Sequence, residues 1–357
     1  MNEYFNKRLE CIVRKEPIQI DTKQYPQHVY NYRPGKPHDF NSVKEQYLWT
    51  ALPESSKDEK DSFMNIDWPK ELQLIEQWML SHLGEIIYYQ IKPIGMRNKK
   101  GKYKLAHFKQ EQTKYLNVDG SYNDEKAKAA ILMHQKRLSL EQRHKFNKLI
   151  EYIHSDKFKN EVQEYAKNSI NQIKHYLRAN VLIGCVTTDY NNPTMWENYA
   201  RDKRGFVIEY DLSKIHFDDS MYPISELFPI DYVNDLPYVS ILPLIKRAFH
   251  DKLYNEEYVN PKNTELFTNI LKQLLVKRQK YNFECEWRFI SKTNKLYLPV
   301  SAVYMGRHIC KTSENKLMQI CKKNKISLYK QYLDSNNDMQ FKCILKNGEY
   351  YDDNEEE

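Results

Sequence analysis

The stretch NNPTMWENYARDKRGFVIEYD, residues 191–211, joins a short predicted helix to a predicted buried strand. Asn192 is a favourable N-cap, a proline follows it at the first helical position, and Gly205 is predicted to end the helix after about three turns. Trp196 and Tyr199 are three residues apart and therefore share a helix face. Packing of that face into the core explains this spacing, and so does a helix that forms one wall of a ligand cleft.

A second stretch, YNFECEWRFISK at residues 281–292, has the alternation of a strand. This alternation places Glu284, Glu286 and Arg288 on one face and mostly apolar side chains on the other. Successive charges on one face cannot be buried without partners. They form an exposed sheet face or a cross-strand ion-pair ladder, or else they present a carboxylate and a guanidinium to a ligand.

The remaining chain predicts an α+β fold. Strands are expected at HVYNYR, VLIGCVTT, GFVIEYDL, PIDYV, LYLPV, AVYMG and FKCILK, and helices within 123–178 and around 240–255, 262–280 and 312–324. We therefore expect a mixed or antiparallel sheet with a helical insertion. The predicted organisation is a polar lead-in at 1–24, one domain over 25–346 and an acidic tail at 347–357; within the domain, 25–91 is a strand-and-helix unit, 92–120 a basic insertion, 121–180 helical and 181–346 a C-terminal sheet.

The basic insertion has an excess of lysine over acidic residues. Its central cations are Arg97, Lys99, Lys100, Lys102 and Lys104. A solvated surface insertion explains this composition, and an arm that contacts nucleic acid is the alternative.

Composition excludes several classes of protein. The chain has 357 residues and a formal net charge of +7, and it contains neither an apolar run of membrane-spanning length nor an N-terminal signal peptide, so we expect a cytoplasmic protein. The cysteines are scattered, which predicts free thiols and no metal site. The glycine-rich and nucleophile-elbow motifs of P-loop enzymes, dinucleotide-fold dehydrogenases and serine hydrolases are absent from the sequence.

Together these blocks resemble a bacterial family described as a domain of unknown function. The resemblance is carried by an N-terminal Tyr32-Arg33 pair, the segment Trp49–Pro53, the MW-x-x-YA block and the E-x-E-W-R block that ends at Arg288. Asn198 stands where that family often has a histidine, and DEKDSFMN replaces its usual turn after the first proline. Members of the family often occur in mobile elements and phage-defence regions, which implies a role in defence.

The same layout more distantly resembles the ADP-ribosyltransferase fold, which implies a split sheet and NAD as a substrate. The implied catalytic carboxylate is Glu286, with Glu284 orienting the acceptor. The residues implied to contact NAD are Tyr32, Arg33, Trp196, Tyr199 and Arg288.

The function that this resemblance implies is a toxin-like, NAD-dependent ADP-ribosyltransferase, or another NAD-consuming enzyme, of an anti-phage or mobile-element system. Its partners would be a protein or nucleic-acid acceptor and a neutralising antitoxin or chaperone, with no membrane. The basic insertion slightly favours a nucleic-acid acceptor. The alternatives are a non-catalytic nucleic-acid-binding or sensor module of a defence system, and then a nuclease built around the E-C-E-W-R carboxylates.

Overall fold

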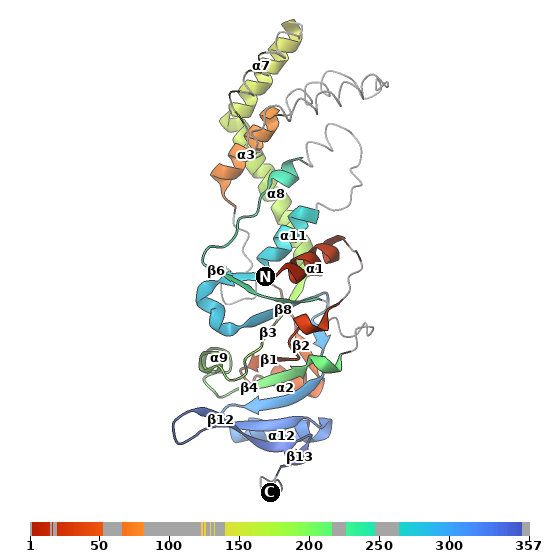
Figure 1. Ribbon diagram of the computed structural model, residues 1–357, viewed down its shortest axis with the longest axis vertical. Coiled ribbons are helices and arrows are strands. Elements are labelled where there is room, and N and C mark those ends of the chain that lie inside the picture. The colour runs from red at the N-terminus through yellow and green to blue at the C-terminus, as the bar shows by residue number, and fades with distance from the viewer. Residues whose placement is uncertain are drawn as a thin grey trace. The chain divides into compact units, whose positions relative to one another are not determined.

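The computed structural model describes two compact units of the chain (Figure 1). The described residues are 2–14, 16, 20–52, 66–81, 123, 125, 129, 132, 140–215, 226–246 and 264–351. The first unit comprises Met1–Phe63, Tyr176–Leu236 and Leu271–Glu357, and the second comprises Met64–His175 and Pro237–Ile270. The range 25–346, predicted as one domain, is thus divided between both units.

A nine-stranded sheet forms the centre of the first unit. Its order is β13 (Glu349–Tyr350), β12 (Met339–Lys346), β11 (Ser327–Leu333), β10 (Val300–Met305), β4 (Phe206–Asp211), β1 (His28–Arg33), β3 (Leu182–Thr187), β8 (Glu286–Ser291) and β5 (Leu227–Pro229). Only β10 and β11 run parallel in it. Two small sheets pair β2 (Tyr47–Trp49) with β9 (Lys295–Tyr297) and β6 (Asp231–Val233) with β7 (Val276–Arg278). The predicted α+β class with a mixed, mostly antiparallel sheet is confirmed.

The joint between β1 and β3 is the narrowest in this sheet. β1 pairs with β4 along its whole length, and β3 does so with β8, whereas β1 and β3 meet at the pair Tyr30–Thr187. The side-chain amide of Asn31 adds a hydrogen bond of 2.8 Å to the Cys185 carbonyl. The nine strands are therefore hydrogen-bonded as one sheet, where a split sheet was expected, but its two parts are joined across a single residue pair.

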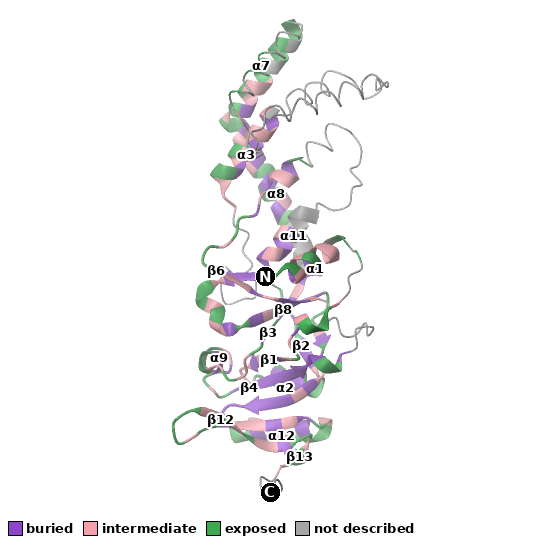
Figure 2. Ribbon diagram, viewed as in Figure 1, coloured by how far each residue is buried: buried purple, intermediate pink, exposed green. Residues whose placement is uncertain are grey.

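Helices cover both faces of the sheet. On one face, Phe5 of α1 (Glu3–Arg14) packs on Trp287 with ring centroids 5.6 Å apart, and Phe40 of α2 (Pro37–Lys44) packs on Phe206 at 5.3 Å. Helix α12 (Lys311–Asn324) lies beside α2. On the other face, α9 (Pro193–Asn198) buries Trp196 against β1, β4 and β10. Every residue of β4 is consequently buried, as its purple ribbon in Figure 2 shows.

The turn between α9 and β4 differs from the expectation. Helix α9 ends at Asn198, well before Gly205, and Arg201, Asp202 and Lys203 all have positive φ angles of 49° to 62°. Gly205 instead allows two backbones to meet, because a Cβ atom there would lie 2.0 Å from the Arg33 carbonyl oxygen. The glycine is therefore required by close packing at the start of β4.

The second unit is mainly helical where it is described. It contains α3 (Trp68–Ser81), α7 (Leu140–His154) and most of α8 (Asp156–Asn180), and α7 and α8 agree with the helices predicted in 123–178. The buried Glu71 carboxylate accepts hydrogen bonds from the hydroxyl of Ser240 and the backbone N–H of Ile241, both at 2.9 Å. None of the helices that the structure describes is both long enough and apolar enough to cross a bilayer.

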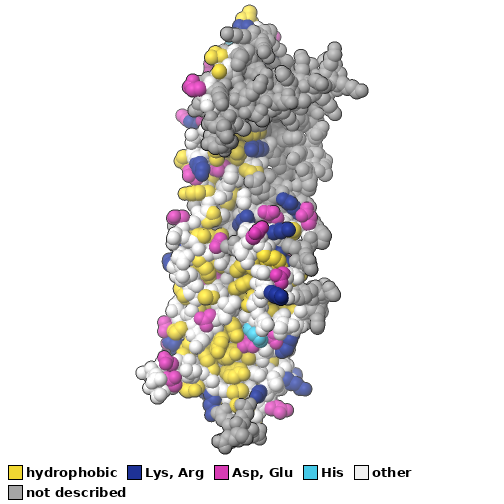
Figure 3. All heavy atoms as spheres, viewed as in Figure 1, with side chains coloured by type: hydrophobic (Ala, Val, Ile, Leu, Met, Phe, Trp, Pro, Cys, Tyr) yellow, Lys and Arg dark blue, Asp and Glu magenta, His cyan; other side chains and the backbone are white. Residues whose placement is uncertain are grey.

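Hydrophobic side chains gather on the part of the surface over β4 and α12, in the lower half of Figure 3. The cationic and acidic side chains of this part lie mainly along its margins.

Helix α11 (Thr264–Gln273) ends earlier than the helix predicted for 262–280, because Val276–Arg278 form strand β7 beside β6.

Candidate functional site

Two carboxylates and a guanidinium from the E-C-E-W-R block converge in the first unit, but they do so differently from a regular strand. Glu284 ends a short 3-10 helix, Gln279–Glu284, and Glu286 begins β8. Between them Cys285 has a φ of 43°. This left-handed residue turns the chain, so the prediction of one strand over 284–288 is wrong, yet both carboxylates still approach the same cation.

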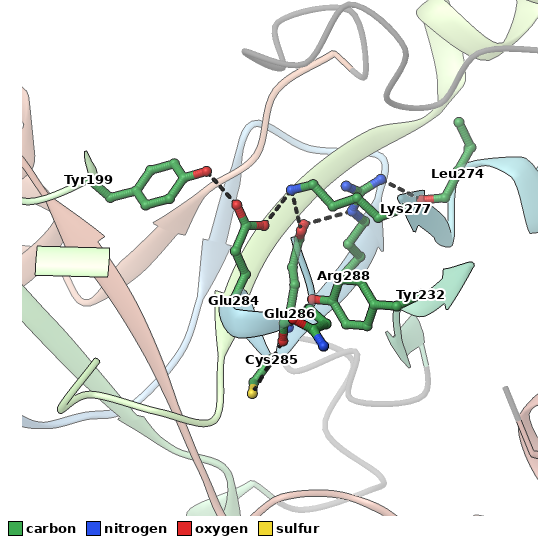
Figure 4. A network of polar contacts seen from close by, with 9 residues as sticks. Tyr199, Tyr232, Leu274, Lys277, Glu284, Cys285, Glu286 and Arg288 are labelled. Atoms are coloured by element: carbon green, nitrogen blue, oxygen red, sulfur yellow. Dashed lines mark hydrogen bonds and ion pairs between the residues drawn. The ribbon is translucent and has the colours of Figure 1, made fainter. Parts of the chain in front are cut away.

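That cation is Lys277, in the middle of β7. Its ammonium group contacts Glu284 and donates to Glu286 Oε2 at 2.9 Å (Figure 4). On the opposite side of Glu286, Arg288 Nε donates to Oε1 at 2.7 Å. Glu286 is therefore held between two cations, and Lys277 is shared by two carboxylates.

Neighbouring groups fix the outer members of this network. The hydroxyl of Tyr199 donates to Glu284 Oε1 at 2.6 Å, and Arg288 Nη1 donates to the Leu274 carbonyl at 2.6 Å (Figure 4). The backbone N–H of Glu286 donates to the Tyr232 hydroxyl at 2.8 Å. The side chains of Lys277 and of both glutamates are at most 8 % exposed, so their charges are held by one another more than by water.

The surroundings of Glu284 and Glu286 shift the pKa values of the two carboxyl groups in opposite directions. Burial alone would raise the pKa of Glu286, but the Arg288 and Lys277 cations lower that pKa to about 2. Burial raises the pKa of Glu284, and the shared Lys277 cation and the Tyr199 hydroxyl oppose this rise only in part. Burial and the bond to Glu284 also raise the pKa of the Tyr199 phenol, which therefore stays a donor at neutral pH.

An exposed cysteine borders the buried network. Cys185 is directly opposite Arg288 on the neighbouring strand β3, and its thiol hydrogen-bonds Glu286. Cys185 is exposed although it lies in a central strand, and Glu286 and Arg288 beside it are buried. The exposed Cys185 side chain thus lies next to the buried Glu286 carboxylate.

The predicted cofactor contacts on β1 are placed apart by strand alternation. Tyr32 is buried under α9, and its hydroxyl donates to the Asp189 carbonyl at 3.0 Å. Arg33 points to the opposite face, where its guanidinium lies 3.9 Å from Asp39. The structure therefore does not bring Arg33 to the Glu286 network.

The two aromatic residues of α9 also have different roles. Trp196 is fully buried, and its indole N–H donates to the Tyr190 carbonyl at 2.9 Å, so it is a core residue that supports the helix. Tyr199, at the C-cap, is the residue that reaches the network. Arg97, Lys99, Lys100, Lys102 and Lys104, predicted to contact nucleic acid, lie outside the described residues.

Sequence reasoning missed Lys277 and Tyr232. The only signal for Lys277 was a lysine after the apolar run of LKQLLVKR, in a segment that was predicted as helix. Among the described residues, no group of three or more His, Cys, Asp or Glu side chains is arranged to hold a metal ion.

Comparison with known proteins adds one match. Residues 195–289 match the family model described as "Protein of unknown function (DUF2971)". This span includes Tyr199, Lys277 and the Glu284–Arg288 segment, and thus all the charged members of the network. Neither a curated protein nor a solved structure gives a match. The chain is thus similar, over residues 195–289, to a domain whose function is unknown.

Proposed function

We propose that the chain breaks the nicotinamide–ribose bond of NAD and transfers ADP-ribose to an acceptor, which is a protein, a nucleic acid or water. The observation that carries this proposal is the pair of buried carboxylates, Glu284 and Glu286, which share Lys277 but have different second partners, so that their pKa values shift in opposite directions. Such pairs divide acid–base and electrostatic roles in enzymes that cleave glycosidic bonds.

The reaction assigns one role to each carboxylate. The bond between ribose C1′ and the ring nitrogen breaks, and nicotinamide leaves as a neutral molecule with the bonding electrons. The positive charge that develops on the ribosyl group is stabilised by Glu286, which stays ionised because of Arg288 and Lys277. The acceptor's O–H or N–H then attacks C1′, and Glu284 accepts the released proton.

The other residues position these carboxylates. Tyr199 orients Glu284 from the end of α9, and the Tyr232 hydroxyl holds the backbone of Glu286. They touch the carboxylates or their backbone rather than a substrate, so they are positioning residues. As a proposal about biology, an enzyme of this kind acts as a toxin in an anti-phage or mobile-element system.

The test measures nicotinamide release from NAD by the full chain, with water, a bacterial lysate or RNA as the acceptor. We expect Glu286→Gln to lower the rate at least about 100-fold, within the range of a lost catalytic carboxylate. Glu286→Asp keeps the charge and displaces it, and should lower the rate as well. Glu314→Gln is the matched control, because Glu314 is also a buried carboxylate paired with lysines, in α12.

Three readouts decide the outcome. Thermal unfolding of each variant separates loss of activity from loss of the fold. Growth of a bacterial host that expresses each variant tests whether toxicity depends on Glu286. Absence of nicotinamide release by the wild-type chain with all three acceptors, or full activity of folded Glu286→Gln, would overturn the proposal and leave the network a structural ion-pair cluster.

A further inference from the structure

A second buried carboxylate lies on the same face of the main sheet as Glu286. Residues directly opposite each other in neighbouring strands point to the same face, and the row Glu209–Tyr30–Thr187–Glu286 runs across β4, β1, β3 and β8. Three strand spacings separate the Cα atoms of the two glutamates by about 14 Å. The narrow β1–β3 joint lies between them.

Hydroxyl donors hold this second carboxylate. The Tyr304 hydroxyl donates to Glu209 Oε2 at 2.7 Å, and Tyr304 is buried. Ser301 donates to Oε1 at 2.5 Å, and His28 Nδ1 lies 3.2 Å from the same oxygen. Because Ser301 is half-buried and the His28 side chain is 41 % exposed, Oε1 is the oxygen on the solvent side.

Tyrosine rings surround the carboxylate. Tyr190 stacks on Tyr304 with centroids 4.6 Å apart and lies 5.1 Å from Tyr30, while Tyr329 stacks on the far side of Tyr304 at 4.9 Å. Tyr30, Tyr190 and Tyr329 are only half-buried, so parts of these rings face solvent. Burial and the nearby Glu209 carboxylate raise the pKa of Tyr30 and Tyr304, so both phenols remain protonated.

We infer that Glu209 and these tyrosines bind the adenosine half of the substrate. A carboxylate whose outer oxygen already accepts from the Ser301 hydroxyl, with His28 beside it, is suited to the adjacent hydroxyls of a ribose, which would replace Ser301 and His28. Half-exposed aromatic rings beside it are suited to a nucleobase, because base–aromatic stacking stabilises such contacts. The pairing of this site with Glu286 rests on the proposed function, in which the two carboxylates serve the two riboses of NAD.

The experiment is calorimetric titration of the full chain with adenosine and with 2′,3′-dideoxyadenosine. We expect adenosine to bind at least tenfold more tightly, because only adenosine offers two hydroxyls to Glu209. Glu209→Gln and Ser301→Ala should weaken adenosine binding and narrow this preference, and Tyr190→Leu should weaken both ligands. Ser301→Ala alters only the solvent-side contact, so it keeps the test valid if Glu209→Gln does not fold.

Two controls separate this inference from the proposed reaction. Tyr332→Leu removes an exposed tyrosine from the opposite face of β11 and should leave binding unchanged. Glu286→Gln should retain adenosine binding while losing NAD turnover. The inference would be overturned if the wild-type chain bound neither nucleoside or bound both equally. It would also be overturned if adenosine binding were unchanged in Glu209→Gln and Ser301→Ala. Adenosine binding without NAD turnover by the wild-type chain would instead overturn the proposed reaction and leave this site standing.

Discussion

At the scale of single residues, the position of Glu286 between two cations has a thermodynamic consequence. The folded chain holds this carboxyl group ionised down to a pH of about 2, whereas the unfolded chain protonates it near its usual pKa of 4.5. A depressed carboxyl pKa stabilises the folded state above the unfolded pKa, and this contribution disappears as the pH falls through the folded value.

We therefore predict a reduced acid sensitivity for Glu286→Gln. Between pH 4.5 and about 2 the unfolded wild-type chain takes up a proton at this residue while the folded chain does not, so stability falls with pH. The linked term is on the order of 3 kcal/mol. Urea unfolding across this pH range should show a shallower loss of stability in the variant than in wild type or Glu314→Gln. An unchanged slope would contradict the assigned environment of Glu286.

Tyr199 gives a second prediction, about the pH dependence of catalysis. Its hydroxyl bond to Glu284 favours the ionised carboxylate, so Tyr199→Phe should raise the pKa of Glu284 further. Because ionised Glu284 is the proposed base, the acidic limb of kcat should move upward by roughly 1 pH unit, as expected for one charge-assisted hydrogen bond. A lower kcat at every pH, with no displacement of the limb, would indicate that Tyr199 has only a structural role.

These residues also show how far sequence reasoning reached. Glu284, Glu286 and Arg288 could be predicted because adjacent charges in an apolar strand demand partners. Lys277 could not, because its proximity depends on β7 pairing with β6 in a parallel ladder that leaves no local periodic pattern. Arg33 was grouped with Tyr32 by the resemblance to the ADP-ribosyltransferase fold, and strand alternation separates them.

At the scale of elements, the strands were the most predictable part. HVYNYR and FVIEYD coincide with β1 and β4 because buried strands read as apolar or alternating runs between turn residues. The end of α9 was not predictable, because the left-handed residues 201–203 are an unusual choice that tertiary contacts impose. One of these contacts is the bond from His308 N to the Lys203 carbonyl.

A substitution at Gly205 tests how closely this turn is packed against β1. Gly205→Ala would place a methyl group 2.0 Å from the Arg33 carbonyl oxygen, so β1 or β4 must shift, at a cost of roughly 3 kcal/mol or more. Gly35→Ala is the matched control: Gly35 has a φ of +83°, but a methyl carbon there would lie 3.8 Å from its nearest non-adjacent neighbour, the Gly205 Cα. It should cost only roughly 1 to 2 kcal/mol. Chemical denaturation of both variants checks the order, and equal losses would refute steric crowding at Gly205.

At the scale of the whole molecule, the main sheet depends on how its two parts are joined. The Asn31 side-chain bond to the Cys185 carbonyl supports the single Tyr30–Thr187 pair. Asn31→Ala should destabilise the fold by about 1 kcal/mol and speed amide hydrogen exchange in β1 and β3. Asn324→Ala removes a comparable bond, from Asn324 to the Lys44 carbonyl, and should leave exchange at this joint unchanged. Uniform exchange in all three proteins would show that the joint needs no side-chain support.

The narrow joint also has a mechanical meaning. Two strands that are joined by many backbone hydrogen bonds resist twisting relative to each other, whereas two strands joined at a single residue pair resist it less. Glu209 and Glu286 lie on either side of the Tyr30–Thr187 pair, and the hydrogen bond from Tyr199 of α9 to Glu284 also spans this joint. Rotation about that pair would change the span between the two carboxylates and strain the bond from Tyr199 to Glu284. The twist at this joint would thus set the distance between Glu209 and Glu286, and with it the length of a ligand that contacts both carboxylates.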